Sequence, residues 1–149
     1  MDEAAVRGLA RFKGKARCLL CHHGPHFMDD KSHTLGVPQV GPPEEDLGRY
    51  DVMQAEREKG VFKVPTLHSV SEAAPFMHDG AFKTLEEVID FLDQGGGPNS
   101  HLSPLMTPWG LTTDENTDLL AFLTRIQQLE TCSSQSLLKM CERESGLEF

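Results

Sequence analysis

Two cysteines and a histidine form the pattern Cys-x2-Cys-His at Cys18, Cys21 and His22. Thiols at this spacing can each add to a vinyl group of one porphyrin, and the adjacent imidazole can ligate the iron from one face. Zinc also accepts a Cys-x2-Cys pair, but structural zinc sites usually add a second, closely spaced ligand pair. The other cysteines, Cys132 and Cys141, are distant from the motif and widely spaced. The motif therefore favours one covalent haem c, with zinc binding or an inert cysteine pair as alternatives.

The composition suits a small acidic haem domain. Aromatic residues make up only 7% of the 149 residues, so a large apolar cofactor would supply burial that side chains do not. The formal net charge of −9 disfavours nucleic acid and an anionic membrane surface as partners, and it suits a basic redox protein. No stretch approaches the roughly 20 apolar residues of a membrane span. We expect a haem domain over residues 1–130 and a helical extension over residues 131–149.

The first residues lack the basic-then-apolar layout of an export signal. Covalent haem is attached to bacterial proteins after export, so this start conflicts with the haem motif. We expect that a signal was removed or that the chain is a fragment, and that the protein works in the periplasm.

An amphipathic helix is predicted at the start of the chain. Asp2 can cap it, and Gly14 follows its end near Phe12. Apolar residues recur three and four positions apart, and we expect them to form the buried stripe: Val6, Leu9 and Ala10. A short helical turn over residues 18–22 should then bring both thiols to one porphyrin edge.

Two further helices each open with a capping box. The first opens with Thr84 and Glu87, and glycines at 95–97 stop it; its predicted buried stripe is Leu85, Val88, Ile89 and Leu92. The second opens with Thr112 and Glu115, and its apolar residues recur strongly: Leu119, Leu120, Phe122, Leu123, Ile126 and Leu129.

The remaining segments lack a sustained period. Residues 23–60 are predicted to form an ordered loop with at most a short polar helix over 52–59, and residues 61–82 a close-packed irregular chain. Histidines 23, 26 and 33 are interpreted as hydrogen-bonding loop residues. The tail from Cys132 is predicted to be a helix capped by Ser133 or Ser134. With no convincing strand, the sequence predicts a mostly α fold with long ordered loops and an appended C-terminal helix.

Several motifs then occur in a characteristic order around CLLCH: GLARF (8–12), GPHFMD (24–29), DLGR (46–49), FKVPTL (62–67), APFMHDG (74–80), TLEEV (84–88) and the helix over 111–123. This order resembles the C-terminal haem domain of bacterial di-haem cytochrome c peroxidases and MauG-like proteins, over residues 5–129. The resemblance implies a cytochrome c-like haem domain that relays electrons. The family's N-terminal haem domain, where peroxide is handled, has no counterpart in this sequence.

The resemblance also implies a second iron ligand on the helix after the His-Asp-Gly turn, Met in peroxidases and Tyr in the MauG branch. The corresponding residue is Leu92, which cannot ligate iron and which we expect on the distal side of the haem. The sixth position is therefore empty or held by water, Met77, Met106 or His78.

This chain also differs from the family pattern at other positions. The family usually carries Arg-Asn where this chain has His68 and Ser69, so Arg49 is the cation that we consider for a haem propionate. We consider His78 and Asp79 as weak candidates for acid–base catalysis, although both could simply hold a tight turn. Cys132 and Cys141 could form a disulfide or remain free thiols.

We interpret the sequence as a c-type haem electron-transfer domain that serves a redox partner protein. One alternative is a mono-haem, peroxidase-like enzyme that uses hydrogen peroxide at an open distal site. Another is a docking fragment that works only with a partner that carries the second haem.

Overall fold

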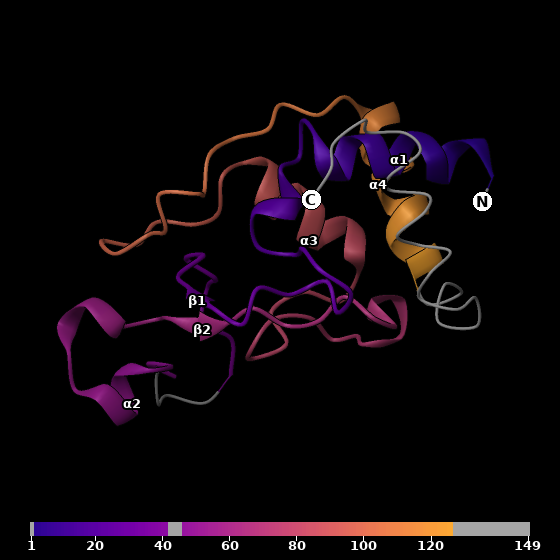
Figure 1. Cartoon of the computed structure of the whole chain (residues 1–149). Helices are drawn as coiled ribbons and strands as arrows, with labels where there is room; N and C mark the ends of the chain where they lie inside the picture. Colours follow the sequence, from indigo (N-terminus) through magenta and orange to yellow (C-terminus); the bar gives the residue numbers. More distant parts are fainter. Residues whose placement is uncertain (1, 42–45, 127–149) are drawn as a thin grey trace.

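The computed structural model describes residues 2–41 and 46–126 (Figure 1). Over these residues the elements, with η for 3-10 helices, are α1 (Glu3–Lys13), η1 (Cys18–Leu20), β1 (Ser32–His33), α2 (Tyr50–Met53), η2 (Glu56–Glu58), β2 (Phe62–Lys63), η3 (Val70–Glu72), α3 (Leu85–Asp93) and α4 (Thr113–Arg125). The protein is helix-rich with little sheet. None of the described helices is both long and apolar enough to cross a membrane. The predicted tail helix and the Cys132–Cys141 pair lie outside the described residues.

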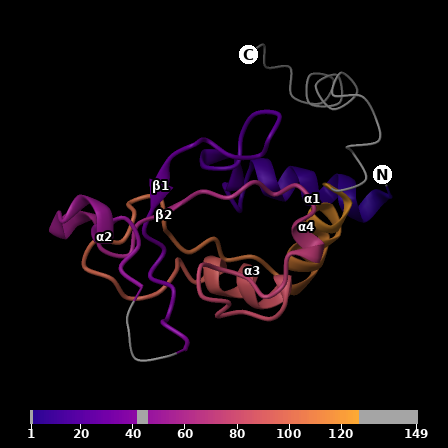
Figure 2. The ribbon, with the colours of Figure 1, turned by 90° about the horizontal axis from the view of Figure 1, so that it is seen from below.

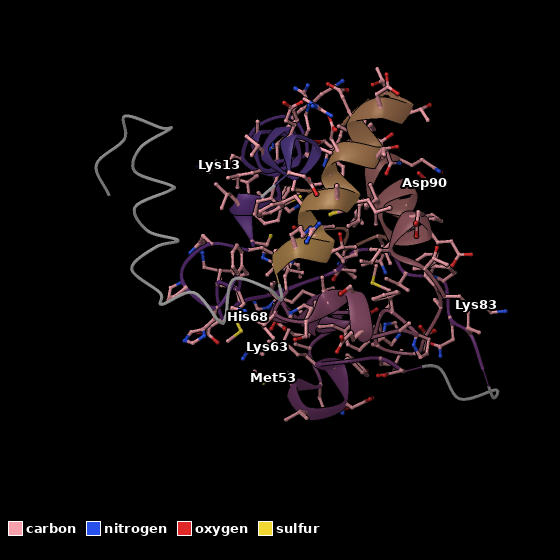
Figure 3. All side chains as sticks on the ribbon, turned by 90° about the vertical axis from the view of Figure 1, so that its right-hand side faces the viewer. Lys13, Met53, Lys63, His68, Lys83 and Asp90 are labelled. Atoms are coloured by element: carbon pink, nitrogen blue, oxygen red, sulfur yellow. The ribbon has the colours of Figure 1, made fainter. Side chains whose placement is uncertain are left out.

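The longer helices and the small sheet occupy different ends of the molecule. Helices α1, α3 and α4 gather at one end, while α2 lies at the other, beyond the β1–β2 pair (Figures 1 and 2). Side chains labelled in Figure 3 mark the two ends, with Lys13 and Asp90 near one and Met53 near the other. Long loops connect the ends, as the scarcity of periodic sequence predicts.

Helix α1 has the predicted ends but not the predicted buried face. The Asp2 carboxylate accepts a hydrogen bond from the Ala5 amide at 2.8 Å, and Gly14 follows the last turn. The buried residues are Ala5, Gly8, Leu9 and Phe12. Val6 and Ala10 are exposed, so the predicted stripe is wrong except at Leu9. The prediction counted only apolar side chains, whereas the face is centred on a residue without one.

Helices α1 and α4 approach each other closely at Gly8. A methyl group at this position would lie 2.7 Å from the Phe122 Cβ and would overlap the backbone of Asp118. Beside this contact, Arg7 binds the Asp118 carboxylate with two nitrogens, at 3.0 Å from Nε and 2.9 Å from Nη2. Asp118 is buried, and this ion pair compensates its charge.

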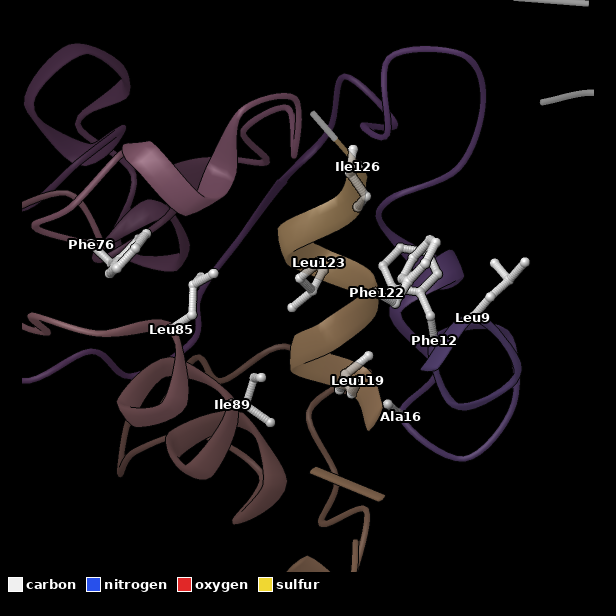
Figure 4. Packing of buried hydrophobic residues seen from close by; sticks show 10 residues of the cluster. All are labelled: Leu9, Phe12, Ala16, Phe76, Leu85, Ile89, Leu119, Phe122, Leu123 and Ile126. Carbon is white, nitrogen blue, oxygen red and sulfur yellow. The ribbon is translucent and has the colours of Figure 1, made fainter. Parts of the chain in front are cut away.

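Helix α4 forms the centre of the hydrophobic core (Figure 4). On one side its Phe122 ring packs edge-on against Phe12, with ring centroids 5.1 Å apart. On the other side Leu123 points toward α3, which carries Ile89. The helix therefore joins α1 and α3 into one core, as its predicted apolar residues require.

Both predicted capping boxes are present. At α3 the Glu87 amide donates to the Thr84 hydroxyl at 3.2 Å, and at α4 the Glu115 amide donates to the Thr112 hydroxyl at 3.3 Å. The stripe of α3 is confirmed at Leu85 and Ile89, which are buried, and at half-buried Val88, which packs against the core. Leu92 is half-buried.

Two predictions for the middle of the chain are wrong in detail. Strands β1 and β2 form an antiparallel pair in which Ser32 opposes Lys63 and His33 opposes Phe62. Two residues per strand are too few to produce the alternating pattern by which strands are recognised. The single polar helix expected over 52–59 is instead two short elements, α2 and η2, separated at Gln54, which adopts a left-handed conformation with φ of 52°.

We expect Gly8→Ala to destabilise the protein by about 1–3 kcal/mol, because the methyl group must push α1 away from α4. Urea unfolding followed by circular dichroism measures this change. The matched control is Ala10→Ser on the exposed face of the same helix, which should change stability by less than about 0.5 kcal/mol. Equal stabilities of the two variants would contradict the close packing at Gly8.

Candidate functional site

One tight turn carries all three residues of the Cys-x2-Cys-His motif. The amides of Cys21 and His22 both donate to the Cys18 carbonyl, at 3.2 and 2.8 Å. Before the turn, Arg17 adopts a left-handed conformation with φ of 56°, and its Nη1 donates to the Thr107 hydroxyl at 2.7 Å. The short turn predicted from the motif is confirmed, and both thiols are free in the structure.

The two thiols have different surroundings. Cys18 packs against the hydrophobic core, and burial raises the pKa of its thiol to about 12. Burial also raises the pKa of Cys21, and the negative charge of Asp29 adds to this effect. Both side chains are therefore protonated thiols at neutral pH.

His22 is held in one orientation by a backbone carbonyl. Its Nδ1 lies 2.8 Å from the carbonyl oxygen of Phe27. Because a carbonyl only accepts, Nδ1 carries the proton and the lone pair is on Nε2. Burial lowers the pKa of His22, although the Phe27 carbonyl, the Asp29 charge and the Pro65 carbonyl oppose this effect. A neutral imidazole whose other nitrogen is fixed in this way suits metal ligation.

A second layer of contacts holds the loop that provides the Phe27 carbonyl. The Thr66 hydroxyl donates to the His26 carbonyl at 2.7 Å, and the His68 Nε2 lies 2.9 Å from the Pro25 carbonyl. The Phe27 ring also packs edge-on against His68, with centroids 5.6 Å apart. The orientation of His22 thus depends on a segment about forty positions further along the chain.

His78 and Asp79, the candidate acid–base residues, lie in a tight turn. Asp79 accepts from the Ala81 amide with Oδ1 at 3.2 Å and from the Val40 amide with Oδ2 at 2.6 Å. His78 stacks on Phe62 at 3.8 Å, and its buried Nε2 has no hydrogen-bond partner among the described residues. Asp79 is engaged in holding loops together, and its Oδ2 also lies 4.0 Å from His78 Nε2, an ion-pair distance.

The other predicted site residues are distributed around the loops. Arg49 Nε donates to Glu58 at 3.0 Å, so a propionate would have to share this guanidinium. Met77 lies in the turn with φ of 72°, and Met106 lies close to Gly96, where a methyl group would be 3.2 Å from its Cε. These two methionines are half-buried, as is Leu92.

Sequence reasoning missed a cluster beside the motif. Asp29 and His33 lie next to Cys21, and the potential ligand atoms of the three side chains are within 4.8 Å of one another. His33 was interpreted as a loop hydrogen-bonding residue, and Asp29 was not considered. The spacing Cys-x7-Asp-x3-His matches no common metal motif, so only the folded loop reveals the cluster.

Comparison with known proteins identifies relatives of this chain, although no protein-family model matches it. The cytochrome-c peroxidase IdrP2 of Pseudomonas sp. strain SCT is 40% identical over 83% of this chain and 39% of its own length. MauG, the methylamine utilization protein of Methylorubrum extorquens, is 36% identical over 85% of this chain and 36% of its own. This chain is a homologue of cytochrome c peroxidases and MauG proteins. The resemblance inferred from the order of motifs is confirmed.

The fold agrees with this relationship. A crystal structure of a MauG-like protein associated with microbial copper homeostasis superposes with a TM-score of 0.77 and 29% identity, over 85% of this chain and 47% of that protein. The chain spans about two fifths of the length of the curated cytochrome c peroxidases and MauG proteins that it matches.

The residues of the motif fit the haem c that such relatives imply. Two free thiols lie on one turn, and the Nδ1 of the neighbouring imidazole is occupied by the Phe27 carbonyl, so that Nε2 carries the lone pair. Cys18 and Cys21 would hold the porphyrin, and His22 would ligate the iron.

The raised thiol pKa values predict slow alkylation of the haem-free chain. Only the thiolate reacts, so iodoacetamide labelling of Cys18 should rise about tenfold per pH unit from pH 8 to 11. Cys21, which lies further from the core, should label faster at each pH. Peptide mass spectrometry separates the cysteines. A Cys18 rate that levels off below pH 10 would contradict its burial.

Proposed function

We propose that this chain is a c-type haem domain that transfers electrons, with a cytochrome c-like fold and one haem. Cys18 and Cys21 bind the porphyrin covalently, and His22 is the axial iron ligand. When bound, the haem exchanges single electrons with a redox partner. The observation that carries this proposal is the hydrogen bond from His22 Nδ1 to the Phe27 carbonyl, beside two free thiols on one turn.

The chain's own residues orient the ligand and exclude water. The Phe27 carbonyl fixes the His22 ring, and a bond of this kind raises the basicity of the opposite nitrogen. Half-buried apolar side chains pack against the same core as Cys18: Leu19, Phe27, Leu67, Val70, Phe82 and Trp109. An apolar surrounding of this kind limits solvent access, which tunes the redox potential of a haem.

A redox partner and a periplasmic location follow from the same proposal. The net charge of −9 suits a basic electron-transfer partner. Because the chain spans about two fifths of its curated relatives, a partner or a further segment that carries a second haem would complete the unit that these relatives contain.

One observation favours a second candidate function, a mono-haem peroxidase-like enzyme. His78 has a buried Nε2 without a hydrogen-bond partner among the described residues, so it could accept or donate a proton. Against this function, both carboxylate oxygens of Asp79 are bound to backbone amides. Rapid peroxide turnover by the haem-loaded chain without an added partner, lost in His78→Gln, would favour the enzyme.

The covalent haem is tested by expressing the chain in an export-competent host that attaches haem. Haem staining after denaturing electrophoresis should show the cofactor on the parent chain. Cys18→Ser and Cys21→Ser should each leave at most one thioether bond, visible as a shift of the reduced absorption maximum. His22→Gln should lose the proposed axial ligand, while His23→Gln, at its exposed neighbour, should behave as the parent. Haem that leaves with acidified solvent would refute the proposal.

Leu92 is proposed to lie on the distal side of the haem, where relatives carry an iron ligand. Leucine has no lone pair, so the ferric haem should be high-spin or weakly ligated. Leu92→Met should create a low-spin His/Met centre with a methionine-to-iron absorption band. The substitution nearly conserves volume, and its packing cost should stay below about 1.5 kcal/mol.

The matched control for this substitution is Leu92→Ile, which should leave the spectrum unchanged. If the parent is already low-spin and Met77→Ala or Met106→Ala removes the methionine band, the sixth ligand comes from a loop. That outcome would contradict the proposed role of position 92.

A further inference from the structure

Cys21, Asp29 and His33 form a cluster beside the haem motif that the proposed haem function does not use as a unit. Cys21 follows η1, Asp29 lies in the next loop, and His33 is the second residue of β1. Their sulfur, carboxylate oxygen and ring nitrogen atoms all lie within 4.8 Å of one another. A cation between them would contact three different types of donor atom.

Asp29 directs an unpaired oxygen into this cluster. Its Oδ1 accepts from the Lys31 amide at 2.9 Å, while its Oδ2 is buried and has no hydrogen-bond partner among the described residues. The side chain is only 1% exposed. A buried carboxylate oxygen without a hydrogen-bond donor is costly, and the contact that faces it is an ion pair with the His33 ring at 3.7 Å.

His33 presents a second unpaired atom to the same space. Its Nε2 is buried without a hydrogen-bond partner and lies 3.7 Å from Asp29 Oδ2, too far for a hydrogen bond. Its Nδ1 lies 3.3 Å from the hydroxyl of Ser103, which is itself buried. A proton on Nδ1 would be donated to that hydroxyl, leaving the lone pair on Nε2, as in metal-ligating histidines.

We propose that the chain binds one Zn²⁺ through Cys21 Sγ, Asp29 Oδ2 and His33 Nε2 as long as Cys21 is a free thiol. Sulfur, nitrogen and oxygen together suit a borderline cation, and a water molecule would complete four-coordination. On binding, the Cys21 thiol releases its proton to solvent and a zinc–sulfur bond forms, with no change in oxidation state.

The distances between the three donor atoms allow this coordination if the atoms move slightly closer together. Ligand bonds of roughly 2.0–2.3 Å place neighbouring donor atoms about 3–4 Å apart in a tetrahedral site. The Asp29 to His33 separation of 3.7 Å already falls in this range, and Cys21 must move by less than the length of one bond. The charge of Asp29, which disfavours the thiolate in the empty cluster, would instead stabilise the cation.

Zinc at this site would compete with the haem. Cys21 cannot donate a thiolate to zinc and also form a thioether with a porphyrin, so the bound cation should block attachment at Cys21 and leave Cys18 free. The zinc site does not require the haem proposal to be correct, because it concerns the chain before any haem is attached.

Cobalt provides the optical probe for this site. The full, reduced, haem-free chain is titrated with Co²⁺, which should bind one per chain with a near-ultraviolet sulfur-to-cobalt band that Zn²⁺ displaces. Cys21→Ser should abolish the band. Ser103→Ala should weaken binding about tenfold, as expected for the loss of a contact to a ligand, and Asp29→Asn and His33→Gln should weaken it further.

The controls are Cys18→Ser and His26→Gln, which remove the other motif thiol and another loop histidine and should bind cobalt as the parent does. Loss of the band in Cys18→Ser would identify a Cys-x2-Cys chelate and overturn the proposal. A missing band, or one that survives in Cys21→Ser, would overturn it as well.

A second measurement uses the unmodified protein and does not depend on the folding of variants. Zn²⁺ should protect Cys21 but not Cys18 from alkylation, as shown by peptide mass spectrometry. Equal protection of both thiols, or protection of neither, would contradict the site.

Discussion

The hydrogen bond between His22 Nδ1 and the Phe27 carbonyl is the contact on which the functional site depends. It selects the tautomer and directs the lone pair of the opposite nitrogen. The carbonyl is in turn held by contacts of Thr66 and His68 with the neighbouring loop carbonyls. The imidazole that follows directly after two cysteines is thus oriented by residues that come much later in the chain.

The position of the motif also depends on residues far along the chain. Helix α1 leads into the turn that carries the cysteines, and its packing on α4 requires the missing side chain of Gly8. The paired charges of Arg7 and Asp118 lie beside this contact and fix the two helices relative to each other. The close approach of the two backbones thus helps to position the turn that carries the motif.

Local features of the sequence were predictable because each is decided within a few residues. The capping boxes at Thr84 and Thr112, the cap at Asp2 and the tight turn at the motif belong to this class. The buried face of α1 was mispredicted because Gly8 contributes by lacking a side chain, and the two-residue strands were too short to be recognised.

The cluster around Cys21 could not be predicted for a different reason. Its three members are brought together by a loop without periodic sequence, and the orientation of His33 depends on Ser103, seventy positions later. The family resemblance directed attention to the cysteines as porphyrin ligands and gave no signal for Asp29. Only the folded chain shows that Cys21 of the Cys-x2-Cys-His motif also lies beside Asp29 and His33.

The packing of α1 against α4 also has a consequence for the order of folding. Phe12 precedes the haem motif, whereas its partner Phe122 is near the end of the described chain. Bringing such distant segments together costs loop-closure entropy, because the intervening chain must be closed into a loop. During synthesis the cysteines are made about a hundred residues before helix α4. Until α4 has been made, the hydrophobic core beside the motif is incomplete.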